Sequence, residues 1–164
     1  MSQVSFENRT VIVTGAGNGL GKAYALELGS RGARVVVNDL GGAVDGSGSG
    51  NTPADEVVNE IIANGGEAVA NYDSVATKEG GASIVQTAID NFGTVDAVVN
   101  NAGILRDKSF ANMSEDELSL IIDVHLKGTF FVSQPAFKVM KENSYGRIVT
   151  VSYTHLRAHE TEEN

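Results

Sequence analysis

A glycine-rich stretch near the start of this 164-residue chain could hold phosphate. The segment "VIVTGAGNGLGKA" places Gly15, Gly19 and Gly21 between a short apolar run and an amphipathic stretch. Glycine lets the backbone turn tightly and approach a pyrophosphate over the first N–H groups of a helix. A P-loop is excluded, because Ala16 and Ala23 stand where that motif needs a glycine and a hydroxyl residue. The remaining pattern, TGxxxGxG, predicts a dinucleotide-binding turn, although tight turns without function use the same residues.

A carboxylate follows the second apolar run, where a dinucleotide site needs one. Asp39 lies 18 residues after Gly21. There it could accept a hydrogen bond from the ribose 2′-hydroxyl of NAD and would repel the 2′-phosphate of NADP, so NAD is favoured. The alternative is an aspartate that starts a turn before Gly41 and Gly42.

Composition points to a small-molecule ligand. The formal net charge is −9, whereas binding to nucleic acid or to a membrane surface needs clustered lysine and arginine. The chain has no cysteine, which excludes disulfides, thiolate metal ligands and a cysteine nucleophile. No apolar run approaches the roughly 20 residues that span a bilayer, and the first strand begins too early for a signal peptide. We therefore expect a cytoplasmic protein with no nucleic-acid or membrane partner.

Short apolar runs alternate with longer amphipathic stretches along the whole chain. This alternation is typical of a parallel sheet whose strands are joined by crossover helices, that is, of an α/β domain. The predicted strands are Thr10 to Val13, Arg34 to Asn38, Glu67 to Asn71, Val95 to Val99 and Arg147 to Val151.

Two local signals set helix boundaries in the second half of the chain. Ser114 and Glu117 have the spacing of a capping box, which predicts a helix start. Pro135 lies inside the last helical stretch, where a proline should kink or end the helix near Gln134.

The segment "TGAGNGLG" together with "NNAG" at Asn100 to Gly103 resembles the short-chain dehydrogenase/reductase family, whose members have a doubly wound Rossmann fold. Four further segments, "VVVNDLGG", "GGEAVANYDSV", "NNAGILRDKSF" and "DVHLKGTF", are similar to the (3R)-hydroxyacyl-CoA dehydrogenase branch found in peroxisomal multifunctional enzyme type 2 and bacterial relatives. The resemblance covers Phe6 to Ser152. It implies a Rossmann domain over residues 1–152 that is incomplete at its C-terminal edge, followed by a foreign or disordered tail over residues 153–164.

The resemblance also implies which residues bind NAD. The three glycines contact the dinucleotide, Asp39 selects NAD, and Asp73 contacts the adenine ring. The full implied set is Gly15, Asn18, Gly19, Leu20, Gly21, Asp39, Asp73, Asn100, Ala102 and Gly103. Without the glycine loop upstream, "NNAG" would be interpreted as a turn after a strand.

The family's catalytic pair is absent from this sequence. Members transfer a hydride between the nicotinamide and a carbinol carbon, with a tyrosine as base and a lysine four residues later that lowers its pKa. Here the residues four positions after Tyr24, Tyr72, Tyr145 and Tyr153 are Leu28, Ala76, Val149 and Arg157. Ser152 is the first of two serines expected after the fifth strand, and Tyr153 replaces the second, catalytic one.

Ser152 and His125 remain as catalytic candidates. His125 occupies the position where many family members place an asparagine that holds a proton-relay water. The alternative, which we favour, is a helix-interior histidine with one satisfied nitrogen. His155 and His159 could share one helix face, but no third ligand is evident, and we expect no metal site.

Three functions remain open. The gene could encode an NAD-dependent oxidoreductase of a 3-hydroxyacyl-CoA or similar secondary alcohol, homo-oligomeric at full length and peroxisomal only in a eukaryote. The chain as written could instead be a non-catalytic NAD-binding module, or a fragment without function. We expect no dehydrogenase activity from it. We also expect the fifth strand to lie at an open sheet edge and the helix after Ser114 to expose apolar residues: Leu118, Ile121, Ile122, Leu126, Phe130 and Phe131.

Overall fold

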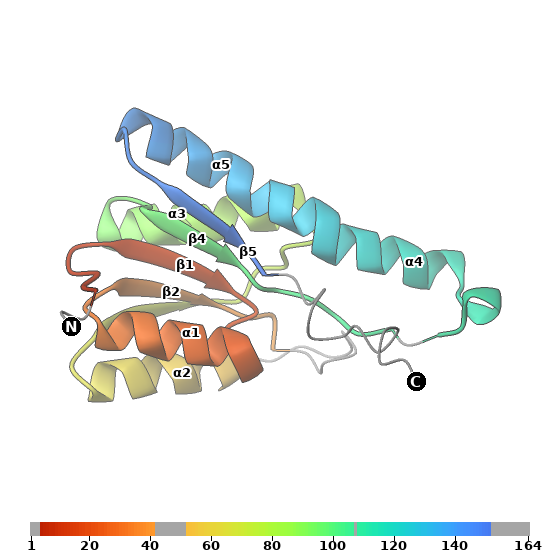
Figure 1. The fold of residues 1–164 in the computed structure, drawn as a ribbon, viewed down its shortest axis with the longest axis horizontal. Coiled ribbons are helices and arrows are strands. Elements are labelled where there is room, and N and C mark those ends of the chain that lie inside the picture. The colour runs from red at the N-terminus through yellow and green to blue at the C-terminus, as the bar shows by residue number, and fades with distance from the viewer. Residues whose placement is uncertain (1–3, 42–51, 107, 152–164) are drawn as a thin grey trace, which may run out of the picture.

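Strands and helices alternate along the chain, as the sequence predicts (Figure 1). The computed structural model describes residues 4–41, 52–106 and 108–151. In chain order the elements are β1 (Thr10–Thr14), α1 (Gly19–Ser30), β2 (Arg34–Asn38), α2 (Thr52–Ala63), β3 (Glu67–Asn71), α3 (Lys78–Phe92), β4 (Ala97–Asn100), the 3-10 turn η1 (Phe110–Asn112), α4 (Glu115–Ile121), the π-helical turn η2 (Ile122–Lys127), α5 (Gly128–Glu142) and β5 (Arg147–Thr150).

The five strands form one parallel sheet with the order β3-β2-β1-β4-β5. The chain therefore builds outward from β1 to β3 and then crosses to the other side of β1 for β4 and β5. This reversal places the topological switch point between β1 and β4, where open α/β sheets bind their ligands. All five predicted strands are confirmed, with β4 beginning two residues later than expected.

The central strands β1 and β2 are buried on both faces because helices cover each side of the sheet (Figure 1). Side chains alternate along the strands, so neighbouring valines enter different cores. One core joins β1 and β2 to α1 and α2 through residues including Val11, Val13, Val35, Val37, Val57 and Ile61. The other joins the sheet to α3 and α5 through residues including Ile12, Val36, Val98, Ile84, Val132 and Met140. The α/β doubly wound Rossmann fold predicted from the sequence is confirmed.

The helix that was predicted to kink or end near Gln134 does not end there, because α5 runs through Pro135 to Glu142. Proline removes the N–H that would bond the carbonyl four residues earlier, here that of Phe131. Helix α3 packs closely on this carbonyl: a Cβ at Gly81 would lie 2.4 Å from the Phe131 oxygen. The Phe131 carbonyl thus lies at the contact between α5 and α3.

The flank formed by β5 and the α4-to-α5 helix is exposed in the part of the chain that the structure describes. All four residues of β5 are exposed, as are Leu118, Ile122, Leu126 and Phe130, whereas Ile121 and Phe131 are half-buried. The expected open edge is confirmed, and the apolar helix surface is confirmed for four of its six residues. No helix among the described residues is long and apolar enough to cross a bilayer.

Candidate dinucleotide-binding site

The carboxyl ends of β1, β2 and β4 lie side by side in the sheet. The glycine loop follows β1, Asp39 follows β2, and the "NNAG" segment completes and follows β4. Parallel strands end at one edge of the sheet, so these three segments meet at the switch point. This is the place where the fold leaves a crevice for a ligand.

Two of the predicted glycines are required by close contacts. Gly15 has a φ of +62°, and a Cβ there would lie 2.8 Å from the Ala102 Cα across the switch point. A Cβ at Gly21 would lie 2.0 Å from the Gly15 carbonyl oxygen. The glycine loop therefore packs directly against both the "NNAG" loop and the first turn of α1. Any side chain at these positions would fill the space between them.

The start of α1 suits an anion. The first N–H groups of a helix have no intrahelical acceptor, and the helix dipole makes this end positive. Asn18 is the N-cap but its side chain makes no capping bond, and the first turn contains no acidic residue. Gly19, with a φ of +54°, has no atom within 4 Å of its would-be Cβ, and Leu20 is exposed. These residues fit a pyrophosphate held by backbone N–H groups.

Asp39 contacts the glycine loop directly. Its Oδ2 accepts a hydrogen bond of 2.7 Å from the Gly17 N–H, and its Oδ1 accepts one of 2.8 Å from the Gly41 N–H. The second bond is the turn contact that the alternative interpretation predicted. Asp39 therefore contacts the glycine loop and also holds the turn at Gly41. Gly17, which the sequence analysis did not single out, is buried, and a Cβ there would lie 2.8 Å from the Asp39 Cγ. Its position inside TGxxxGxG was the available signal.

Thr14 and Asn101 tie the loops after β1 and β4 together. The Thr14 hydroxyl accepts hydrogen bonds from the Asn101 and Ala102 N–H groups, both at 3.1 Å. The Asn101 side-chain amide donates to the Thr14 and Gly15 carbonyls at 3.1 and 3.0 Å. Neither residue was predicted as functional, although each lies inside a quoted motif. The structure shows that these motifs are two halves of one junction.

The first and last residues of "NNAG", Asn100 and Gly103, contact α5 and the turn η2 that precedes it. The Asn100 side-chain amide donates to the Ser133 hydroxyl at 2.9 Å. A Cβ at Gly103 would lie 2.8 Å from the Cε1 atom of His125. Of the predicted set, Asn100 is thus engaged with α5, and Gly103 makes room for a histidine ring.

His125 lies in the π-helical turn η2 and is exposed. Its Nε2 lies 3.1 Å from the Ile104 nitrogen and 3.0 Å from the Ile104 oxygen. One ring nitrogen is therefore satisfied by the backbone after "NNAG", as the structural interpretation requires. Its catalytic role stays a hypothesis. Ser152, Tyr153, His155 and His159 lie outside the described residues, which themselves contain no group of three metal-ligating side chains.

Tyr72 follows β3 at the same edge but is not suited to act as a base. Its hydroxyl donates to the Asp55 carboxylate of α2. This hydrogen bond, with smaller contributions from burial and from the charge of Asp55, raises the pKa of Tyr72 above its usual value. A phenolate base needs the opposite shift. Asp73, the next residue, is held by Asn71 and makes no contact with the glycine loop among the described hydrogen bonds.

Comparison with known proteins identifies relatives of this architecture. The family described as short chain dehydrogenase matches residues 9–159. Peroxisomal multifunctional enzyme type 2 of Mus musculus is 54% identical over 151 residues, covering 92% of this chain and 20% of that enzyme. The crystal structure of a short chain dehydrogenase from Mycobacterium avium is 48% identical with a TM-score of 0.80, covering 89% of this chain and 54% of that one.

A second solved structure carries a ligand. It is a 7α-hydroxysteroid dehydrogenase complexed with NADH and 7-oxo glycochenodeoxycholic acid, 30% identical to this chain with a TM-score of 0.83. The match covers 97% of this chain and 57% of that one. This chain spans about half the length of the curated relatives it matches, or less.

Proposed function

We propose, because this chain belongs to the short-chain dehydrogenase family, that it binds NAD(H) at the carboxyl ends of β1, β2 and β4. The observation that carries the proposal is the hydrogen bond between the Gly17 N–H and Asp39 Oδ2. This bond holds a carboxylate beside the glycine loop. The group proposed to accept from the ribose is therefore adjacent to the N–H groups proposed to bind the pyrophosphate. The solved relative complexed with NADH supports the choice of NAD(H) as the ligand.

Each predicted residue is assigned to one part of the dinucleotide. In this proposal the backbone from Gly15 to Gly21, including Asn18, Gly19 and Leu20, surrounds the pyrophosphate. Asp39 accepts from the ribose, Asp73 meets the adenine ring, and Asn100, Ala102 and Gly103 border the remainder. Asp39 would repel the 2′-phosphate of NADP, so NAD is the preferred dinucleotide. When bound, NAD supplies a hydride acceptor at C4 of its nicotinamide.

The activity of the full-length protein is part of the same proposal. We expect oxidation of a secondary alcohol such as a 3-hydroxyacyl-CoA, in a homo-oligomer, since the mouse relative is a peroxisomal multifunctional enzyme and the NADH complex holds a 7-oxo compound. A cytoplasmic location stays a prediction. The 164 residues contain no Tyr-xxx-Lys pair, so this chain should bind NAD without turning over.

Calorimetry and a turnover assay on the 164-residue chain test the proposal. We expect saturable binding of NAD, binding of NADP at least tenfold weaker, and no NADH formation from 3-hydroxybutyryl-CoA above a control without enzyme. NADH formation would contradict the inactive assignment. Failure of a folded chain to bind NAD or NADH would leave only a fragment without function.

A further inference from the structure

A network of buried amide side chains lies behind Asp73, the residue that the proposed function places at the adenine ring. Asn38 and Asn71 are register partners at the ends of β2 and β3. They are 2% and 6% exposed. Most of the other buried strand positions in this sheet hold apolar residues, chiefly valine, and burying an amide without hydrogen bonds is costly. Packing alone therefore does not explain two asparagines here.

Every hydrogen-bonding group of the Asn71 side chain that faces this network is used. Its Oδ1 accepts from the Asn38 side-chain amide at 2.8 Å and from the Asp73 N–H at 3.0 Å. Its Nδ2 donates to Asp73 Oδ2 at 2.9 Å and to the Thr87 hydroxyl at 2.9 Å. Rotating the amide by 180° would set donors against donors, so the network determines its orientation.

The network fixes Asp73 at three points. Asn71 holds its backbone N–H and one carboxylate oxygen, and the Asn38 side-chain amide donates to its carbonyl at 2.9 Å. Among the described residues, Asp73 Oδ1 receives no hydrogen bond, and the side chain is half-buried. One carboxylate oxygen is therefore locked and the other is left to accept from a ligand donor.

We infer that Asn71 is a positioning residue for recognition of the nucleotide base. By locking Asp73 Oδ2, Asn71 aims Oδ1 so that it accepts a hydrogen bond from an exocyclic amine, as on adenine, and disfavours a base that presents a carbonyl oxygen there. Asn38 and Thr87 support Asn71 from β2 and α3. This inference rests on the proposed function, because it assumes that the adenine ring of NAD lies beside Asp73.

The test compares NAD with nicotinamide hypoxanthine dinucleotide, whose base carries a carbonyl in place of the adenine amine. Dissociation constants are measured by calorimetry for the wild-type chain, Asn71→Ala, Asp73→Asn and Thr87→Val. We expect wild type to prefer NAD about tenfold, the scale of one hydrogen bond to a charged acceptor. Asn71→Ala and Asp73→Asn should lower this preference to twofold or less. The matched control is Thr87→Val, which removes one hydrogen bond to Asn71 but none to Asp73. It should keep most of the preference for NAD over the hypoxanthine dinucleotide.

The ratio of the dissociation constants for the two dinucleotides distinguishes a positioning role of Asn71 from a purely structural one. A purely structural Asn71 would weaken both dinucleotides equally and leave the ratio near ten, which would overturn the inference. Wild type that fails to bind NAD would overturn the proposed function itself. Should Asn71→Ala not fold, the Asn71 side-chain amide signals of the wild type, followed by nuclear magnetic resonance, decide the matter. They should shift with NAD and much less with the hypoxanthine analogue, and equal shifts would contradict the inference.

Discussion

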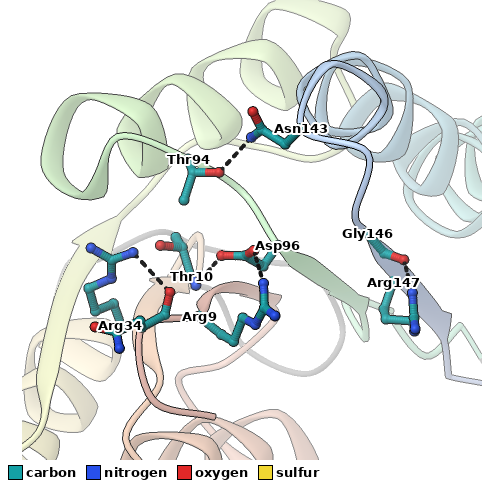
Figure 2. Close-up of polar contacts among 9 residues, drawn as sticks. Arg9, Thr10, Arg34, Thr94, Asp96, Asn143, Gly146 and Arg147 are labelled. Carbon is teal, nitrogen blue, oxygen red and sulfur yellow. Dashed lines mark hydrogen bonds and ion pairs between the residues drawn. The ribbon is translucent and has the colours of Figure 1, made fainter.

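The two ends of the sheet use their charged groups in opposite ways. At the amino end, Asp96 is paired with a cation: its Oδ1 accepts from Arg9 at 2.9 Å and its Oδ2 from the Thr10 N–H at 2.8 Å (Figure 2). At the carboxyl end, the hydrogen bonds that Asp39 accepts from the described residues come from the backbone N–H groups of Gly17 and Gly41. One carboxylate is neutralised within the protein, and the other keeps its negative charge at the crevice.

The amino end joins three strands through these contacts. The Arg9 guanidinium, just before β1, lies 3.8 Å from the centre of the Tyr145 ring, just before β5. Asp96, just before β4, is 8% exposed, and its carbonyl accepts from the Arg147 N–H of β5 at 3.0 Å. Figure 2 shows this end together with the bond from the Asn143 side chain to Thr94. Its ionic and backbone contacts are made within the chain, while the buried Thr10 hydroxyl and Arg34 Nε have no hydrogen-bond partner among the described residues.

The difference separates stability from binding in one small sheet. Carboxylates paired inside the protein contribute to folding, whereas carboxylates that keep a free oxygen or an uncancelled charge can recognise a ligand. Substitutions at the two ends should therefore change different measurements. The predictions below move from the largest expected effect to the smallest.

Gly21→Ala should have the largest effect, because its Cβ would overlap the Gly15 carbonyl. Forcing α1 away from the glycine loop should lower the free energy of unfolding by about 3 kcal/mol, the upper range for overpacking. It should also weaken NAD binding at least tenfold. Urea unfolding and calorimetry measure the two effects. Gly29→Ala is the matched control on the same helix. Its Cβ would lie 2.9 Å from Cγ2 of the buried Ile61 side chain of α2 and not at the glycine loop, so it should also lower stability but leave NAD affinity unchanged.

Asp96→Ala should lower stability without changing the affinity of the folded protein for NAD. The substitution leaves the Thr10 N–H and the Arg9 guanidinium without their acceptor, at a cost of about 2 kcal/mol. Urea unfolding gives the free energy, and NAD titration under native conditions gives the affinity. A change in the NAD dissociation constant greater than about threefold would break the proposed separation between the two ends.

Asp39→Asn should give the opposite result. Its stability should change by less than about 1 kcal/mol, since the amide oxygen can still accept one of the two backbone hydrogen bonds. The preference for NAD over NADP should fall about tenfold, because the charge that repels a 2′-phosphate is lost. Paired titrations with the two dinucleotides measure this ratio, and an unchanged ratio would remove Asp39 from the binding site.

Ser114→Ala should give the smallest effect, at the start of α4 and away from both ends. Ser114 and Glu117 form the predicted capping box, and the backbone and side-chain hydrogen bonds from Ser114 lower the pKa of Glu117 from its usual 4.5. The ionised box therefore stabilises the fold above that pH and loses its contribution as the pH falls through the lowered pKa. Alanine at this position removes the side-chain hydrogen bond but keeps the backbone N–H, which is the larger cause, so the Glu117 pKa should rise only part of the way toward 4.5 in a carboxylate titration by nuclear magnetic resonance. An unchanged pKa would mean that the Ser114 hydroxyl does not contribute to the shift.

Much of the fold could be predicted from the sequence because its signals are local. Valine-rich runs mark the strands, the spacing of Ser114 and Glu117 marks a helix start, and glycine spacing marks the turn after β1. The same holds for the identity of the residues at Gly15, Gly21 and Asp39. Each of these signals lies within a few residues of the chain, where backbone geometry and side-chain periodicity act directly.

The tertiary structure alone decided which distant groups meet. The close approach of Gly81 in α3 to the Phe131 carbonyl in α5 depends on how the two helices pack, and the bond from Gly17 to Asp39 depends on the register of β1 with β2. The junction of Thr14 with Asn101 likewise needs β1 beside β4, as the amide network behind Asp73 needs β2 beside β3. These contacts join segments up to 87 residues apart. Sequence spacing carries no record of them, because strand order and helix packing bring the partners together only when the sheet forms.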